Sequence, residues 1–374
     1  MNKTRLNVIF KKYIENFEMI NNEKNDETYK WEIAQEFQNF DVNANDFSEM
    51  LTQMWKTSAN LIDNSQQLPF YALVDYSHKE PETVRQMFKK LYKNEHCDDI
   101  EKQQIINEFI AESEKLREKY YPESRLYVNN QRAVMMYLFL RYPESNFGYK
   151  ASQAKSFADC IEFYDDWGPM TDFKLDVFSR MCKEIIEEIK QNEALLTTHK
   201  SRFENTNRKL HPDNNLHILT LDIIFSSQAY NFYDGMTYDP INAKSRKLHL
   251  ERAAKAKELA AVVEKAKSDF DMLQEAKCYI TDVLKPGEVV YYNRNTEGKV
   301  IENDGSLISI ELADKTVKKL GISAVLNNGL LTFDSDEIEQ KLKSYLPILK
   351  NEYQIPRTLE RASNELQPYM EYLD

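Results

Sequence analysis

The sequence predicts a mainly α-helical protein that carries a small antiparallel β-barrel near its C-terminus. Only eight glycines and eleven prolines occur in 374 residues, which favours helices over many tight turns. Apolar residues recur three and four positions apart over most of the chain, whereas residues 286–320 alternate with a period near 2. A chain of this length exceeds one ordinary compact core, so several domains are expected.

Residues 1–241 are expected to form one large helical domain. Its first helix is indicated by an apolar stripe at three- and four-residue spacing: Leu6, Ile9, Phe10, Tyr13, Ile14 and Phe17. Asn45 or Asp46 suits the cap of the next helix, and Pro81 precedes an acidic first turn that suits the positive end of a helix dipole. Strongly apolar segments such as RAVMMYLFLRYPES and LHILTLDIIFSSQAYNFY need packed partners, which predicts one shared core.

Residues 242–281 are predicted to form one long basic helix. The segment is rich in alanine, lysine and glutamate, and between Lys244 and Lys267 the basic residues outnumber the acidic ones. Two interpretations stay open. The helix is either a solvated spacer that packs along one narrow face, or its basic face meets phosphate groups.

Residues 282–333 are predicted to form a small SH3-like barrel, followed by a helical tail over residues 334–374. The strands are EVVYYN, KVIEN, SLISIEL and VKKLGI. They are separated by hairpins at NTEG, at Asn303, Asp304 and Gly305, and at DKT. A sheet this small buries little apolar surface unless it curls onto itself, which favours a barrel.

Motifs for catalysis are not found, so we expect no catalytic residue and no cofactor. A phosphate-binding P-loop needs an upstream glycine that the Gly298 and Lys299 pair lacks, and this pair lies in a predicted hairpin. No dinucleotide fingerprint, nucleophile elbow or Cys/His dyad is present in the sequence. The protein is therefore expected not to be an enzyme.

A metal site is also not expected. His211, His217 and Asp222 lie close in sequence, but their spacing is neither HxxxH nor HxH, and His217 enters an apolar segment that suits a core histidine. The four cysteines are widely spaced without a CxxC pair, so free thiols are expected.

The charge and the hydropathy limit the classes of partner. A net charge of −12 opposes unspecific attraction to nucleic acid or anionic membrane, although a local basic surface can still bind either. No window approaches the roughly 20 apolar residues that span a bilayer, and the first residues lack the apolar segment of a signal peptide. We expect a cytoplasmic protein without membrane contact.

Recognition chemistry is concentrated in the long helix and the barrel. Aromatic rings beside cations can stack bases and pair phosphates, as single-strand binders do, although acidic residues in the barrel offset much of its positive charge. Nucleic acid and protein are therefore both open as ligands of the barrel. The candidate binding residues are Lys244, Arg246, Lys247 and Arg252 in the helix, and Tyr291, Arg294, Lys299, Lys318 and Lys319 in the barrel.

Two resemblances to known families can be stated on these residues. Over residues 25–235, segments such as ETYKWEIAQEFQNFDVNANDFSEMLTQM, EPETVRQMFKKLY and LYVNNQRAVMMYLFLRYPESNFGYKAS resemble the helical N-terminal region of McrB-type restriction proteins. Those proteins join a recognition region to an AAA+ GTPase motor and act with a separate nuclease. The chain departs from them in having no Walker motif, so the resemblance implies recognition without motor activity.

The second resemblance covers residues 284–331. PGEVVYYNRNTEGKVIE is similar to the opening of the Tudor-like barrels at the C-termini of UvrD-type helicases, with Gly287, Val290, Gly298 and Val300 at the matching positions. The usual Phe-Gly of the hairpin is replaced by Asn295 and Thr296. Such barrels dock proteins or nucleic acid, so the resemblance implies an interaction module.

Together these observations predict a recognition module of a prokaryotic or phage conflict system, related to restriction and defence, that binds DNA or a DNA-bound protein. A DNA-processing protein, such as a separate AAA+ motor or nuclease subunit, is an expected partner. The alternative is an acidic adaptor or inhibitor that binds a nucleic-acid-processing enzyme. The acid excess of the chain favours the adaptor, and the basic stretch from Lys244 to Lys267 favours the DNA-related role.

We predict that the purified chain does not hydrolyse GTP or ATP, because no loop in its sequence can cradle the phosphates. The measurement is phosphate release at saturating nucleotide and magnesium. Turnover that survives stringent purification and is abolished by a point mutation in this chain would contradict the prediction.

Overall fold

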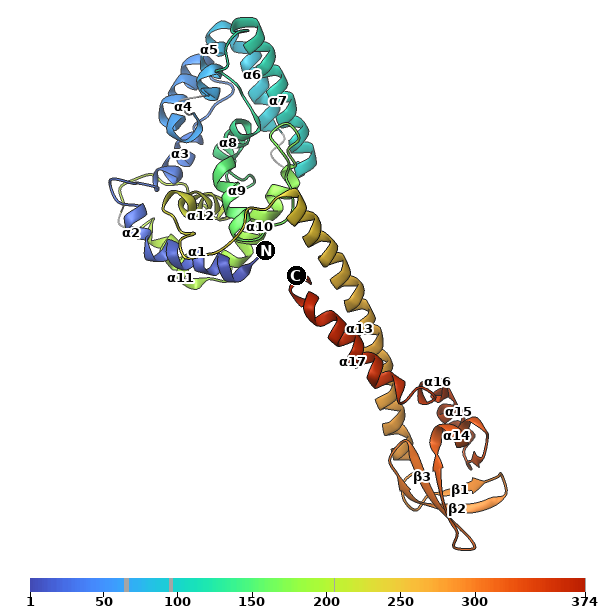
Figure 1. Cartoon of the computed structure of the whole chain (residues 1–374). Coiled ribbons are helices and arrows are strands. Elements are labelled where there is room, and N and C mark those ends of the chain that lie inside the picture. Colours follow the sequence, from blue (N-terminus) through green and yellow to red (C-terminus); the bar gives the residue numbers. More distant parts are fainter. Residues whose placement is uncertain (64–66, 94–96, 205, 374) are drawn as a thin grey trace. The chain divides into compact units, whose positions relative to one another are not determined.

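The computed structural model describes residues 1–63, 67–93, 97–204 and 206–373 (Figure 1). The chain divides into two compact units, an N-terminal unit, Met1–Arg246, and a C-terminal unit, Lys247–Asp374. The described residues form 17 α-helices and a curled five-stranded antiparallel sheet in the C-terminal unit. This confirms the mainly α class with a small β region, while the fourfold division at residues 241, 281 and 333 stays a prediction.

The described part of the N-terminal unit contains twelve helices, and the long α13 begins at the end of this unit. They are α1 (Lys3–Glu15), α2 (Phe17–Ile20), α3 (Tyr29–Phe37), α4 (Phe47–Ile62), α5 (Pro69–Lys79), α6 (Pro81–Lys93), α7 (Asp99–Tyr120), α8 (Gln131–Arg141), α9 (Ala151–Cys160), α10 (Leu175–Lys190), α11 (Glu193–Ser201) and α12 (His217–Ala229).

Local sequence signals explain where several of these helices begin. Asp46 caps α4 by accepting a hydrogen bond from the backbone N–H of Glu49, and α6 begins at Pro81. Asparagine or aspartate side chains cap α1, α7, α8 and α11 in the same way. Nearly every residue of α8 is buried, which agrees with the apolar character of RAVMMYLFLR on all sides of the helix.

The C-terminal unit joins most of a long helix to the sheet and a helical tail. Its elements are α13 (Ala243–Val283), β1 (Val289–Tyr292), β2 (Thr296–Asn303), β3 (Leu307–Leu312), β4 (Val317–Gly321), α14 (Ile322–Asn327), β5 (Leu331–Thr332), α15 (Asp336–Ser344), α16 (Leu346–Leu349), α17 (Gln354–Leu366) and the 3₁₀ helix η1 (Gln367–Tyr372). The strand order is β4-β3-β2-β1-β5, with every neighbouring pair antiparallel. We call β1–β5 together with α14 the half-barrel.

One stripe of α13 supplies the packing surface for the rest of the C-terminal unit. Its buried residues lie three, four or seven positions apart, so they share one side of the helix: Ala256, Leu259, Ala266, Leu273, Ala276 and Ile280. Leu273, Ala276 and Ile280 of this stripe pack with Val290 and Ile308 of the half-barrel in one apolar core. This narrow stripe matches the spacer interpretation of the long basic helix. No helix of the described ranges is long and apolar enough to cross a membrane.

The first hairpin of the half-barrel differs from the prediction. Tyr292 pairs with Thr296, so the turn consists of residues 293–295, and NTEG contributes mainly to β2 rather than to the turn. Asn293 and Arg294 adopt φ values of 50° and 70° and reverse the chain without a glycine. The next turn forms at Asp304 and Gly305, with Gly305 at φ 82°, whereas the third predicted turn residue, Asn303, belongs to β2 and pairs with Ile308.

Gly305 provides a test of how closely the β2–β3 turn approaches α13. A Cβ atom on Gly305 would lie 3.0 Å from the Lys277 Cβ, whereas a Cβ on Gly329, at φ 59°, would meet no atom within 4 Å. We expect Gly305→Ala to destabilise the C-terminal unit by roughly 2–3 kcal/mol and Gly329→Ala by about 1 kcal/mol, because both are backbone-strained and only the first is crowded. Hydrogen exchange of peptides from the half-barrel in the full chain measures both values. Equal losses would contradict the close approach.

Candidate functional site

Two of the four predicted basic residues of α13, Arg246 and Arg252, bind groups of the same chain. Arg246 donates from its guanidinium to the Tyr164 carbonyl at 2.8 Å and to the Asp166 carboxylate at 2.7 Å. Arg252 donates to the Tyr372 hydroxyl at 2.7 Å, and the Lys247 ammonium lies 3.8 Å from the carboxylate of its helical neighbour Glu251. These three cations are therefore partly satisfied before any ligand arrives.

The strand register decides which candidate residues of the half-barrel share a face. Paired residues point their side chains to the same side, and successive residues alternate. Val290, Val300 and Ile310 face the core, so Val289 and its successive partners Lys299, Glu311 and Val317 form a row across the outer face: Val289↔Lys299, Lys299↔Glu311 and Glu311↔Val317.

The remaining candidates follow from the same alternation. Tyr291 and Lys319 lie on the outer face, whereas Lys318 pairs with the core residue Ile310 and lies on the opposite face. The Tyr291 hydroxyl makes a hydrogen bond with Asp334, which raises the pKa of Tyr291. Arg294 lies in the turn between β1 and β2, so the structure gathers most, but not all, of the predicted barrel residues on one surface.

Several cations of the half-barrel stand without an ion-pair partner. Within the ranges that the structure describes, no carboxylate lies within 4.0 Å of the charged atoms of Arg294, Lys299, Lys318 or Lys319, and the same holds for Lys244 in α13. This differs from Arg246, whose charge is met by Asp166. Asp304 interacts with Lys319, and Asp314 with Lys318, beyond ion-pair distance, so these lysines keep donors that an acidic partner can still reach.

Exposed aliphatic side chains accompany these lysines. Val289 is 41% exposed, Ile301 45% and Val317 53%. Single exposed aliphatics are ordinary, but here they share a small sheet with Lys299 and Lys319. The outer face therefore combines aliphatic side chains with charges of both signs, because Glu297, Glu302 and Glu311 share it with Lys299 and Lys319.

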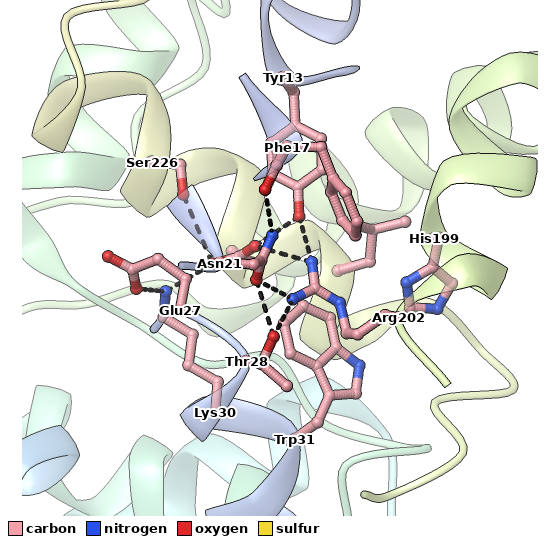
Figure 2. A network of polar contacts seen from close by, with 12 residues as sticks. Tyr13, Phe17, Asn21, Glu27, Thr28, Lys30, Trp31, His199, Arg202 and Ser226 are labelled. Atoms are coloured by element: carbon pink, nitrogen blue, oxygen red, sulfur yellow. Dashed lines mark hydrogen bonds and ion pairs between the residues drawn. The ribbon is translucent and has the colours of Figure 1, made fainter. Parts of the chain in front are cut away.

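The N-terminal unit contains a buried ionic network that the sequence did not reveal (Figure 2). Asp222 of α12 is fully buried and accepts hydrogen bonds from the Lys30 ammonium and the Tyr13 hydroxyl, each at 2.5 Å. Glu27 contacts the same Lys30 ammonium. Burial lowers the pKa of Lys30, but Asp222 and Glu27 outweigh this effect and raise it above its ordinary value, so the lysine is charged.

Arg202 completes the network. Its guanidinium donates to the Tyr13 hydroxyl at 2.7 Å and to the Thr28 hydroxyl at 2.9 Å, and it lies 3.8 Å from the centre of the Trp31 ring. The network thus balances two cations with two carboxylates and ties α1, α3 and α12 to the segment after α11. The charged groups of the network pair with one another, while the Arg202 Nε is buried without a hydrogen-bond partner. Mutual pairing of the charges indicates a structural anchor rather than a site that binds a ligand.

The metal candidates considered from the sequence are separated in the structure. Asp222 belongs to the ionic network, while the His217 Nδ1 lies 2.9 Å from the Asn146 carbonyl oxygen and its ring stacks on Phe147 at 4.1 Å. Burial lowers the pKa of both His211 and His217. Among the described residues, no three histidines, cysteines or carboxylates come together as a metal site.

A polar cavity of about 400 Å³ also lies in the N-terminal unit. Its lining consists of Cys97, Asp98, Asp99, Lys102, Glu144, Ser145, Phe147, Lys183 and His217. Internal bonds occupy its charged groups: Lys102 donates to the Ser145 carbonyl, Glu144 accepts two backbone N–H groups of residues 214 and 215, and Lys183 pairs with Asp99 at 3.3 Å. The cavity therefore ranks below the half-barrel as a site for a partner.

Comparison of the chain with protein-family models, with curated proteins and with solved structures gives no match. The resemblances to McrB-type proteins and to UvrD-type barrels therefore rest on the sequence segments alone.

The ionic network predicts a large penalty for losing one of its charges. We expect Lys30→Met to destabilise the N-terminal unit by roughly 3–5 kcal/mol, because Asp222 and Glu27 would stay buried without their cation. All three tryptophans, Trp31, Trp55 and Trp167, lie in this unit, so urea unfolding followed by tryptophan fluorescence reports on it alone.

The matched control is Lys190→Met, which removes an exposed ion pair with Glu187. We expect this control to change stability by no more than about 0.5 kcal/mol. A Lys30→Met variant as stable as the control would contradict the anchoring role of the network.

Proposed function

We propose that the protein is a non-enzymatic recognition module whose half-barrel binds another protein, and that this partner is a DNA-bound or DNA-processing protein of a prokaryotic or phage conflict system. The observation that carries the proposal is that Lys299 and Lys319 make no ion pair and lie beside exposed aliphatic side chains on one face of a small sheet, with Lys318 unpaired on the other face. A separate AAA+ motor or nuclease subunit fits this role as a partner. The cytoplasm is the proposed location.

The composition of the surface favours a protein over a nucleic acid. Protein interfaces combine aliphatic and aromatic side chains with charged groups, and the outer face offers Val289, Tyr291 and Val317 together with Lys299 and Glu311. Lysines attract acidic partners and speed the encounter with them. A chain of net charge −12 repels the phosphate backbone as a whole, which weakens the case for DNA.

The topology of the half-barrel supports the SH3/Tudor-like interpretation. The last strand, β5, returns to pair with β1, and the short helix α14 lies between β4 and β5 in sequence. A five-stranded sheet that curls in this way is typical of SH3-like barrels, whose usual task is docking. The resemblances to UvrD-type barrels and to McrB-type recognition regions support the proposed context.

Direct DNA binding is the second candidate, carried by the unpaired Lys244 and by the basic stretch of α13 that continues to Lys267. Its weakness is that Arg246 and Arg252 already bind groups of the same chain. A third candidate role is an acidic adaptor or inhibitor that presents carboxylates of the helical N-terminal unit. Only the net negative charge of the chain supports this role.

The decisive experiment compares the full chain with two triple variants. Lys299→Ala, Lys318→Ala and Lys319→Ala together remove the half-barrel cations, while Lys257→Ala, Lys265→Ala and Lys267→Ala remove exposed cations of α13. We expect one identified DNA-bound or DNA-processing protein, quantified by mass spectrometry, to be captured by the wild type and the α13 triple, and to be lost several-fold from the half-barrel triple.

A salt titration with labelled single- and double-stranded DNA separates the second candidate. If DNA is the ligand, affinity falls with salt at a slope of roughly −0.9 per phosphate contact for duplex and about −0.7 for a single strand, and Lys244→Ala lowers that slope. Equal protein capture by both triples, together with DNA binding that depends on Lys244, would overturn the proposal in favour of DNA.

A further inference from the structure

We propose that the outer edge of β4 binds an extended acidic segment of the partner, which pairs with β4 as an additional strand of the sheet. This inference rests on the proposed function and names the mode of binding and the chemistry of the bound segment. It follows from three properties of β4: its position in the sheet, the direction of its backbone groups and its charge.

β4 is an edge strand: it stands at one end of the strand order β4-β3-β2-β1-β5 and is hydrogen-bonded to β3. The Leu312 N–H donates to the Thr316 carbonyl, and the Ile322 N–H donates to the Ser306 carbonyl. In an antiparallel pair, hydrogen-bonded positions alternate with open ones. Lys318 and Leu320 therefore bond to β3, whereas Val317 and Lys319 direct their N–H and C=O groups away from it.

The charge of this edge selects the kind of strand that it can accept. β4 reads VKKLG, with two lysines and no acid, and Lys318 and Lys319 make no ion pair within the described ranges. Edge lysines normally protect a sheet from unwanted pairing. The same lysines would attract an acidic strand electrostatically, and the exposed Val317 would give that strand an apolar contact.

Other occupants fit this edge less well. In a second copy paired antiparallel about Lys319, the two Lys319 side chains would oppose each other, and like charges in directly opposed positions destabilise a sheet. The opposite edge of the sheet, β5, is only two residues long, Leu331–Thr332, and offers few backbone groups. β4 with an acidic segment of another protein is therefore the favoured pairing.

The test uses the full chain and a synthetic acetylated and amidated peptide, Thr-Glu-Val-Glu-Val-Glu, as the probe. In the free protein we expect the Val317 and Lys319 amides to exchange quickly with solvent and the Lys318 amide to be protected, as read by NMR. Saturating peptide should slow exchange at Val317 and Lys319. Two further peptides carry N-methyl groups on the odd-numbered or on the even-numbered residues. Every second residue of an added strand directs its N–H toward β4, so only one of these two peptides should lose affinity.

Two variants provide the controls. Lys319→Pro removes one N–H that the fold does not use, so the half-barrel should keep its exchange protection while peptide affinity falls up to about tenfold, the upper value expected for one lost hydrogen bond. Replacing Lys318 and Lys319 with glutamine should lower the affinity for the acidic peptide. A control peptide in which each glutamate is replaced by lysine should bind this variant at least as tightly as it binds the wild type.

The outcomes separate this inference from the proposed function. Protection of Lys319 before peptide is added, no protection after it, or equal binding by Lys319→Pro would overturn strand addition. If the partner captured by the wild type is lost from the half-barrel triple but retained by Lys319→Pro, the proposed function stands and strand addition fails. Loss from both variants supports both.

Discussion

The C-terminal unit depends on one constraint: a sheet of five short strands has an apolar face that it cannot cover by itself. α13 covers that face with Leu273, Ala276 and Ile280, which pack with Val290 and Ile308 in one core. Because this packing uses the inner face, the outer face and the β4 edge stay exposed to solvent. The same constraint that stabilises the half-barrel therefore determines which of its surfaces can meet a partner.

The N-terminal unit obeys a different constraint, set by the fully buried Asp222. A carboxylate without water needs cations and hydrogen-bond donors, and Lys30, Arg202 and Tyr13 converge on it from separate parts of the chain. Such a network stabilises one arrangement of helices and leaves little polar capacity for a ligand. The recognition surface is thus sought in the half-barrel, where cations lack partners.

Local signals predicted much of the fold, while contacts distant in sequence escaped prediction. The Asp46 cap, the start at Pro81 and the turn at Gly305 each depend on a few neighbouring residues, and all three formed as expected. The ionic network joins Tyr13 to Asp222, which no periodicity encodes, although a lone aspartate in an apolar helix was a usable signal. Likewise the sequence grouped Arg246 with Lys319 by charge alone, and only the structure separates the cation paired with Asp166 from the unpaired one.

We propose that recognition takes place at the β4 edge of the half-barrel. The most direct measurement is photo-crosslinking of the full chain in cells, with a benzophenone amino acid at position 317 in β4 or, for comparison, at the exposed position 262 in α13. We expect position 317 to link to an acidic segment of a DNA-bound or DNA-processing protein and position 262 not to link to it. Equal linking of that protein from both positions, or linking from position 262 alone, would contradict it.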